Sequence, residues 1–384
     1  MARPRRAVRP ARRDLRRPGA RHPDAGGVSS YARLAFGAGP AALVGWCFFF
    51  AIPVGAPAAA LFAGDYVGDA FGGGRVTVIV TAVALLAGVA AANAVGMHAS
   101  ARLQFILAGV LLVLMLAAVA VSLPHASWAH LHPFAAHGWT SVVHAGALLV
   151  WSFAGWEAIT HLAAEFRNPD RDLPRATAIA LGVVGVLYLA VAVATVAVLG
   201  ASAGSSRAPL ADLLAYGPGG ARRIAAVMAV LLTAGVLNAY FAGAAKLGAA
   251  LARDGALPDW LAGGSAVGEV PRRSLAALAA MALTSFAVVE WTAIDVRPLV
   301  LLTSAQLATV YAVGIAAALR LLPRRGAAHR GALLGTVAIA ALLAAVGPYL
   351  VWPLVLAVGA VVFVRRKGLR RPGVARVEPP IVPS

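Results

Sequence analysis

The chain has 384 residues, of which 60% are hydrophobic and only 12% charged, and its mean hydropathy is +0.80. A soluble domain of this length would carry roughly twice that share of charge, and all-round apolar helices have no polar face to offer water. Composition therefore excludes a soluble protein and indicates an integral membrane protein. The net charge of +18 does not indicate nucleic-acid binding, because nine Arg lie between Arg3 and Arg21 and most others lie in short loops.

Before the first apolar stretch, residues 1–21 are rich in Arg, Pro and Ala and lack helical periodicity, so we expect a disordered tail. No apolar run follows closely enough to make it a secretory signal. The tail could bind anionic lipid or nucleic acid, but the simpler interpretation is a solvated positive segment that helps to orient the first span. We therefore predict a cytoplasmic tail (1–21), a transmembrane domain (22–364) and a basic cytoplasmic C-terminal tail (365–384).

Ten apolar stretches are each long enough to cross a bilayer, whose hydrocarbon core of about 30 Å needs about 20 helical residues. Gly347–Pro348 is expected to form a tight turn between the last two. The predicted fold is an all-α integral membrane protein with about ten transmembrane helices. The predicted spans are 39–64, 76–99, 103–123, 140–163, 176–200, 224–247, 274–293, 298–319, 329–346 and 348–364.

Lys and Arg predict the orientation, because they collect in the cytoplasmic loops of membrane proteins. With the N-terminus inside, the inside segments hold 27 Lys and Arg, whereas the outside segments hold five: Arg75, Arg207, Arg222, Arg223 and Arg297. This asymmetry predicts a multi-pass protein of the cell inner (cytoplasmic) membrane with both termini in the cytoplasm. Four histidines then fall outside, but their irregular spacing without Cys or carboxylate does not indicate a metal site: His125, His130, His132 and His137.

The fourth stretch contains an ionisable residue, Glu157, and an intramembrane charge is costly enough to need an explanation. Gly155 weakens the helix nearby, so the carboxylate could bind a cation or take up a proton beside a helix break. Alternatively, Glu157 bonds to a neighbouring helix or lies close to the wet surface. Glu157 and His161 share a helix face, which would suit the acid–base pair of a membrane-embedded enzyme, but no nucleophile or metal-ligand set accompanies them.

The next segment, residues 165–175, alternates acidic and basic side chains and predicts an ordered connector. Asn168-Pro169 is expected to end one helix, and Pro174 to lie in the first turn of the next. No glycine-rich phosphate loop, nucleophile elbow or Cys-rich pattern occurs in the chain. We therefore expect neither ATP hydrolysis nor a cofactor.

Four motifs, in this order along the chain, resemble the amino acid–polyamine–organocation permeases. HPDAGGV at 22–28 is similar to the start of that family's third helix. Gly45-Trp46 with IPVGAP at 52–57 resembles one branch, the bacterial efflux transporters that export methionine and branched-chain amino acids. WSFAGWEAITHLAAEFRNPDRDLP at 151–174 is similar to the sixth helix and its following loop, and ARDGALP at 252–258 to the segment after the eighth helix.

The resemblance implies an inverted repeat of five plus five helices, with substrate bound at breaks in the first and sixth helices and transport by alternating access. The sixth-helix break would be Phe153-Ala154-Gly155, whose carbonyls would accept hydrogen bonds from the substrate ammonium. Trp151 corresponds to an aromatic residue that packs on the substrate side chain, and Glu157 to a position linked to gating or proton coupling. Four further residues are expected to line the site, with ordinary bundle packing as the alternative: Ile52, Pro53, Asn238 and Tyr240.

The resemblance also matches residues 39–64 to the family's third helix, so we expect an N-terminally truncated chain without the first two helices. A mis-called start, out-of-frame translation or a truncated gene would explain the Arg-rich tail in their place. The predicted function is export of small neutral or apolar amino acids, with coupling to a proton or cation left open. The alternative is a permease fragment that does not transport. The expected partners are the amino acid and membrane lipids but no nucleic acid, and a homodimer stays open.

Overall fold

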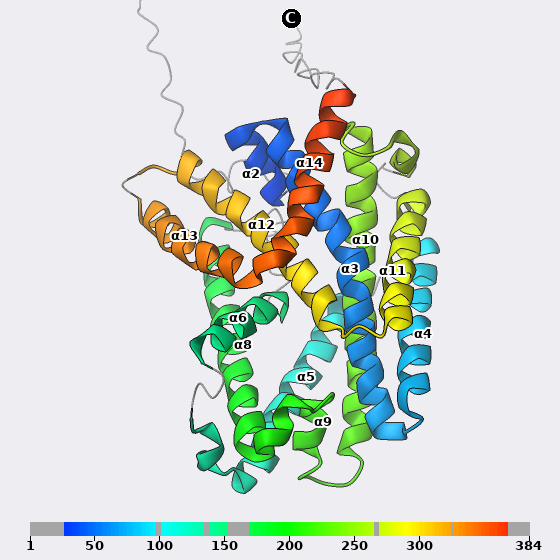
Figure 1. Cartoon of the computed structure of the whole chain (residues 1–384), viewed down its shortest axis with the longest axis vertical. Coiled ribbons are helices and arrows are strands. Elements are labelled where there is room, and N and C mark those ends of the chain that lie inside the picture. The colour runs from blue at the N-terminus through cyan, green and yellow to red at the C-terminus, as the bar shows by residue number, and fades with distance from the viewer. Residues whose placement is uncertain are drawn as a thin grey trace, which may run out of the picture.

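The computed structural model describes residues 27–96, 101–133, 138–152, 169–264, 269–324 and 326–367, and all regular structure in these ranges is helical (Figure 1). Short 3-10 helices connect some of the longer ones. The α-helices are α2 Gly27–Phe36, α3 Ala38–Phe71, α4 Gly74–Ala94, α5 Ala101–Ser122, α6 Trp139–Ser152, α8 Pro169–Leu199, α9 Pro209–Leu214, α10 Ala221–Arg253, α11 Arg272–Thr292, α12 Arg297–Leu321, α13 Ala327–Val346 and α14 Val351–Arg366.

Eight helical stretches in the described ranges are long and apolar enough to cross a membrane, which confirms the predicted fold class. The last of them, Ala328–Arg366, contains both α13 and α14. These two helices turn at the predicted position, where Gly347 adopts a φ of +58°. The predicted span 140–163 is described only as far as Ser152, the end of α6, so its second half lies outside the described residues.

The predicted start of the helix that follows the 165–175 connector is wrong. Pro174 was expected in the first turn of its helix, but α8 begins at Pro169, so Pro174 lies in the second turn. Proline fits the first helical position well because its missing N–H would have no partner there. Pro169 therefore starts the helix, and Pro174 removes one hydrogen bond near its beginning.

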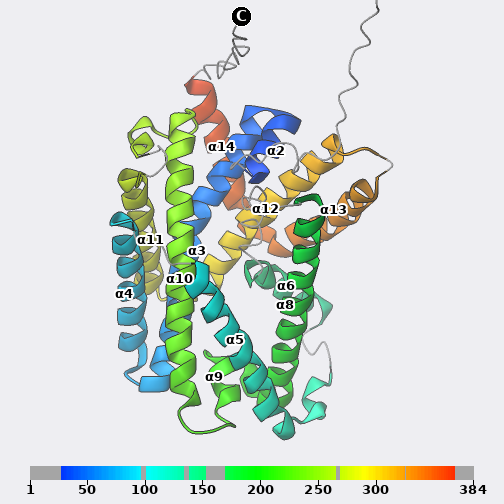
Figure 2. The same ribbon diagram turned by 180° about the vertical axis from the view of Figure 1, so that it is seen from behind.

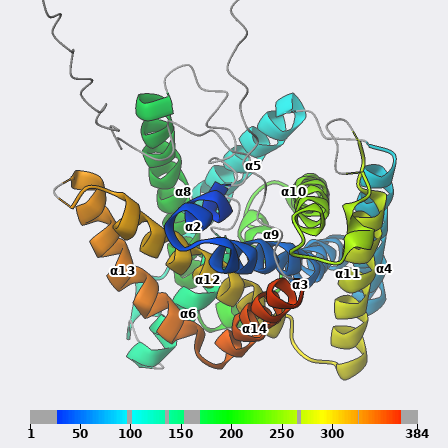
Figure 3. The ribbon, with the colours of Figure 1, turned by 90° about the horizontal axis from the view of Figure 1, so that it is seen from above.

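The central helix is α3, which packs against α2, α4, α10, α11, α12 and α14 (Figures 1 and 3). Two thirds of its most apolar window, 67%, is buried inside the protein. Pro53 and Pro57 lie fully buried within it without ending the helix. Glycines allow close approach of the neighbours, since a Cβ on Gly45 would lie 2.6 Å from Leu251 of α10. Small residues at helix contacts are typical of membrane bundles, where packing replaces the hydrophobic effect.

A second group of helices, α5, α8 and α9, shares its own core with the beginning of α10. Seen from behind, α5 runs beside α10, and α8 lies beyond α5. The short helix α9 lies near the lower ends of these helices (Figure 2). Only 11% of the most apolar window of α5 and 6% of that of α8 is buried. Such exposed apolar side chains suit contact with lipid. The helices can face lipid because their backbone N–H and C=O groups are hydrogen-bonded within each helix.

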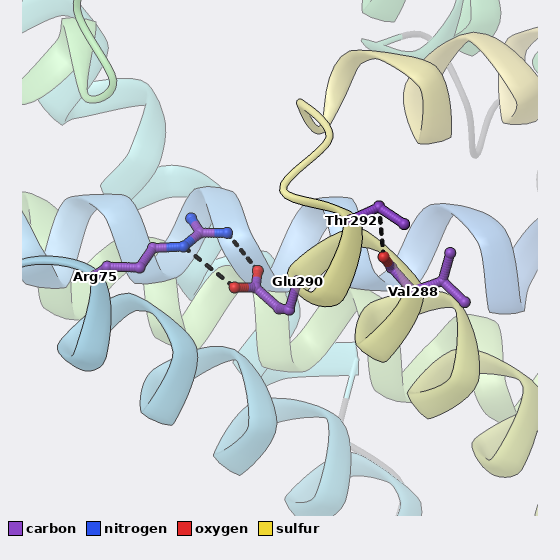
Figure 4. A network of polar contacts seen from close by, with 4 residues as sticks. All are labelled: Arg75, Val288, Glu290 and Thr292. Carbon is purple, nitrogen blue, oxygen red and sulfur yellow. Dashed lines mark hydrogen bonds and ion pairs between the residues drawn. The ribbon is translucent and has the colours of Figure 1, made fainter.

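Several connections between helices lie at one or the other end of the bundle. The upper end in Figure 1 holds α2, the α10–α11 connection and the end of α14, whereas the α3–α4 connection lies toward the lower end. Ion pairs stabilise both ends: Arg33 of α2 with Asp254 at the upper end, and Arg75 of α4 with Glu290 of α11 at the lower end (Figure 4). Which end faces the cytoplasm stays a prediction.

The ARDGALP motif at 252–258 forms the C-terminal cap of α10. Gly255 adopts a φ of +76°, its N–H donates to the Ala252 carbonyl, and the Ala256 N–H donates to the Leu251 carbonyl at 2.7 Å. This is a Schellman cap, in which glycine takes the left-handed position without steric cost. The Trp46 indole N–H of α3 donates to the Ala256 carbonyl at 2.7 Å, so two of the sequence motifs contact each other.

Replacing Trp46 with phenylalanine is expected to lower stability by about 1 kcal/mol, because the Ala256 carbonyl loses its donor. The ring contacts with Phe50 and Phe363 can persist in this variant. Thermal unfolding in detergent measures the change. Trp260→Phe is the matched control, because Trp260 is 54% exposed, and an equal loss in both variants would contradict a role for the indole hydrogen bond.

Candidate substrate site

Three helices meet at Gly55 of α3. A Cβ atom on Gly55 would lie 3.0 Å from the Thr303 Oγ1 of α12 and 3.4 Å from the Trp151 Nε1 of α6. The Trp151 ring also meets Phe62 of α3 edge to face, with ring centroids 5.7 Å apart. Because Gly55 has no side chain, an aromatic and a hydroxyl group can both approach the α3 backbone. Trp151, which the sequence analysis predicted to line the substrate site, therefore packs on α3 beside Gly55 and Phe62.

Thr303, which is 5% exposed, brings a hydroxyl group to this contact. Its hydroxyl donates to the Leu299 carbonyl one turn earlier in α12, at 2.9 Å, so its oxygen can still accept a hydrogen bond. The sequence interpretation missed both Gly55 and Thr303. Gly55 stands inside the quoted IPVGAP motif and could have been found there, whereas Thr303 is one of several hydroxyl residues in an apolar helix.

Ile52 and Pro53 differ in their positions relative to this contact. Ile52 precedes Gly55 by three residues and Phe62 follows it by seven, so all three share one face of α3. Ile52 is partly buried against the main core. Pro53 is fully buried and points away from that face, toward the interior of the bundle. The structure thus brings Ile52, but not Pro53, to the side of Trp151.

Asn238 and Tyr240 lie on α10. The structure places Asn238, 8% exposed, against α4, where its side-chain oxygen accepts a hydrogen bond from Asn93 Nδ2 at 2.8 Å. Asn93 is also buried, and its Nδ2 donates to the Val89 carbonyl at 3.0 Å. Tyr240 is partly buried and, two residues further on, points to the other side of α10. Asn238 therefore joins two helices in a polar pair typical of membrane bundles.

Five predicted residues lie outside the described residues: Phe153, Ala154, Gly155, Glu157 and His161. The described chain stops just before them at Ser152, whose carbonyl accepts a hydrogen bond from the Tyr188 hydroxyl of α8 at 3.2 Å. Tyr188 thus anchors the end of α6 to α8.

The histidines that the sequence analysis assigned to the outside serve separate contacts where they are described. His130 Nδ1 lies 2.9 Å from the Ala197 carbonyl, and the His125 ring packs on Tyr216 with centroids 4.7 Å apart. Within the described ranges, no three His, Cys, Asp or Glu residues stand close enough to hold a metal ion.

The helical bundle, its candidate spans and a contact of α3, α6 and α12 around Gly55 define a multi-pass membrane protein. The sequence pattern of the amino acid permease family matches residues 18–374, and the chain belongs to that family. It is an amino acid transporter of the amino acid–polyamine–organocation permeases, not an enzyme, which confirms the resemblance of the four motifs.

Several relatives align over most of the chain. It is 32% identical over 347 residues to YecA of Bacillus subtilis, an uncharacterised amino acid permease, covering 90% of this chain and 82% of YecA. It is 31% identical over 351 residues to the L-methionine/branched-chain amino acid exporter YjeH of Escherichia coli, covering 89% and 81% of the two chains. An uncharacterised transporter of Mycobacterium bovis is 32% identical over 311 residues, covering 79% and 67%.

Proposed function

We propose that this permease exports small neutral or apolar amino acids by alternating access. The observation that most supports this proposal is the contact of Trp151 with Phe62 and Gly55. An aromatic surface beside a glycine can pack on an apolar substrate side chain. Similarity to YjeH, an exporter of methionine and branched-chain amino acids, supports the same substrate class and direction.

The proposed binding site combines this contact with residues on either side of it. Trp151, Phe62 and Ile52 would face the substrate side chain. The carbonyls of Phe153, Ala154 and Gly155, which follow Trp151 directly in the sequence, would accept hydrogen bonds from the ammonium group. Glu157 would take up a proton or cation and couple transport to its gradient. Both chain termini would lie in the cytoplasm, as the Lys and Arg distribution predicts.

The test is exchange of radiolabelled methionine and leucine by the purified chain in proteoliposomes. We expect exchange above that of protein-free liposomes, with no exchange of lysine or glutamate, because the described contact carries no charged side chain. An imposed pH gradient should accelerate movement of methionine if Glu157 takes up a proton. Exchange of charged amino acids, or no exchange at all, would contradict the proposed substrate class.

A further inference from the structure

Two polar side chains of α12, Gln306 and Ser304, are buried without a hydrogen-bond partner among the described residues, and Gln306 is the larger of the two. Gln306 is 0% exposed, and neither its Nε2 nor its Oε1 forms a hydrogen bond with any of the residues that the structure describes. A buried amide without hydrogen bonds is strongly unfavourable, because its hydrogen bonds to water are lost on burial and no hydrogen bonds within the protein replace them. Such a group therefore needs an explanation beyond packing.

Its position on α12 relates Gln306 to the substrate contact. Thr303 approaches Gly55 of α3, and Val310, two turns later, packs in one cluster with Val44 and Cys47 of α3. Gln306 follows Thr303 by three residues and precedes Val310 by four, so helical periodicity places it on the same face. The amide thus lies one turn from Thr303, on the side of α12 that faces α3.

The Ser and Thr residues that neighbour Gln306 on α12 do not need a ligand. The Thr303 and Thr309 hydroxyls donate to carbonyls of the preceding turn, at 2.9 Å and 2.8 Å. Ser304 is also buried without a partner, but it lies on another face, and rotation of its short side chain can bring its hydroxyl to a carbonyl of its own helix. Gln306 carries two donor hydrogens and an acceptor oxygen on a longer side chain, so one bond to its own helix would leave the amide unsatisfied.

We propose that the Gln306 amide binds the polar end of the amino acid substrate, an inference that rests on the proposed function. Its N–H groups would donate to the carboxylate and its oxygen would accept from the ammonium. The zwitterion needs both kinds of partner, and a single neutral amide supplies both without adding a charge to the bundle. Trp151, whose indole approaches Gly55 opposite Thr303, and its ring partner Phe62 would hold the side chain. Since Gln306 is fully buried in this conformation, substrate reaches it when the contact of α3 and α12 opens during alternating access.

The decisive variant is Gln306→Leu, which keeps a similar volume and removes the amide. Because the wild-type amide has no hydrogen-bond partner among the described residues, the variant should unfold at the same temperature or about 2 °C higher. Its affinity for leucine should fall about tenfold or more, because a hydrogen bond to a charged group is lost. Isothermal titration with leucine and thermal unfolding, both in detergent, measure the two effects. The matched control is Thr309→Val, which should retain wild-type affinity, since the Thr309 hydroxyl bonds within its own helix.

A second measurement asks which end of the substrate the amide contacts. 4-Methylpentanoate, which is leucine without its amino group, should bind the wild type more weakly than leucine does. This difference should shrink in Gln306→Leu, because the variant no longer accepts a hydrogen bond from the ammonium. An unchanged difference would show that the amide does not bind the ammonium and would overturn the proposed contact.

Two further outcomes would overturn the proposal. If Gln306→Leu binds leucine as tightly as the wild type, the amide is not a binding group. If the variant unfolds at a clearly lower temperature, the amide has a partner within the protein and is not free for a ligand. A wild type that binds neither leucine nor methionine would overturn the proposed function itself, whereas loss confined to Gln306→Leu supports both.

Discussion

Replacing Gly64 with alanine is expected to destabilise the bundle by about 1–3 kcal/mol, the usual effect of overpacking a filled interior. A Cβ atom at this position of α3 would lie 2.6 Å from the Val78 carbonyl oxygen and 3.0 Å from the Val78 Cα of α4. These are backbone atoms, so no side-chain rotation can relieve the contact, and the two helices must separate. Thermal unfolding in detergent, followed by tryptophan fluorescence, measures the loss.

Gly88→Ala in α4 is the control for this experiment, because nothing lies within 4 Å of a Cβ atom built there. Alanine favours a helix over glycine by about 1 kcal/mol, so this variant should be as stable as the wild type or more stable. If Gly64→Ala matched the control, the helices would not approach as closely at Gly64 as the structure indicates.

The helices were predictable because a helix that faces lipid is apolar over its whole surface. It therefore appears in a single sequence as an uninterrupted run of apolar residues. Helix ends outside the apolar stretches were harder to predict. The first span, predicted as 39–64, continues to Phe71 in α3 because Asp65 and Asp69 interrupt the hydropathy but not the helix. The Asp69 carboxylate lies 3.7 Å from the Arg222 guanidinium of α10, so a tertiary contact supports the extra turns.

The site was only partly predictable, for the same reason. Trp151 stood in a recognisable motif, but Thr303, which approaches the same glycine, Gly55, lies on a different helix 152 residues further along the chain (303 − 151), and no local pattern connects them. Gln306 could not be distinguished from other polar residues of apolar helices until its burial was known. Periodicity also could not show that Asn238 faces Asn93, because it gives the face of a helix but not the neighbour on that face.

Replacing Trp151 with alanine is expected to weaken binding of methionine and leucine about tenfold to a hundredfold, because burial of an apolar side chain contributes about 1.5–3 kcal/mol. In the proposed site, the indole is the surface on which the substrate side chain packs. The variant also loses the edge-to-face contact with Phe62, so stability should fall as well. Binding is measured by isothermal titration and transport by exchange in proteoliposomes.

Trp139→Ala separates the two effects. Trp139 stands at the other end of the same helix, α6, and is 71% exposed, so its removal should leave substrate affinity unchanged. Phe62→Leu removes the ring partner of Trp151 but keeps the indole and an apolar side chain at position 62, so it should lower affinity less than Trp151→Ala does. If Phe62→Leu and Trp151→Ala reduced affinity equally, the edge-to-face pair rather than the indole surface itself would determine binding. A larger loss in Trp151→Ala would place the substrate side chain against the indole.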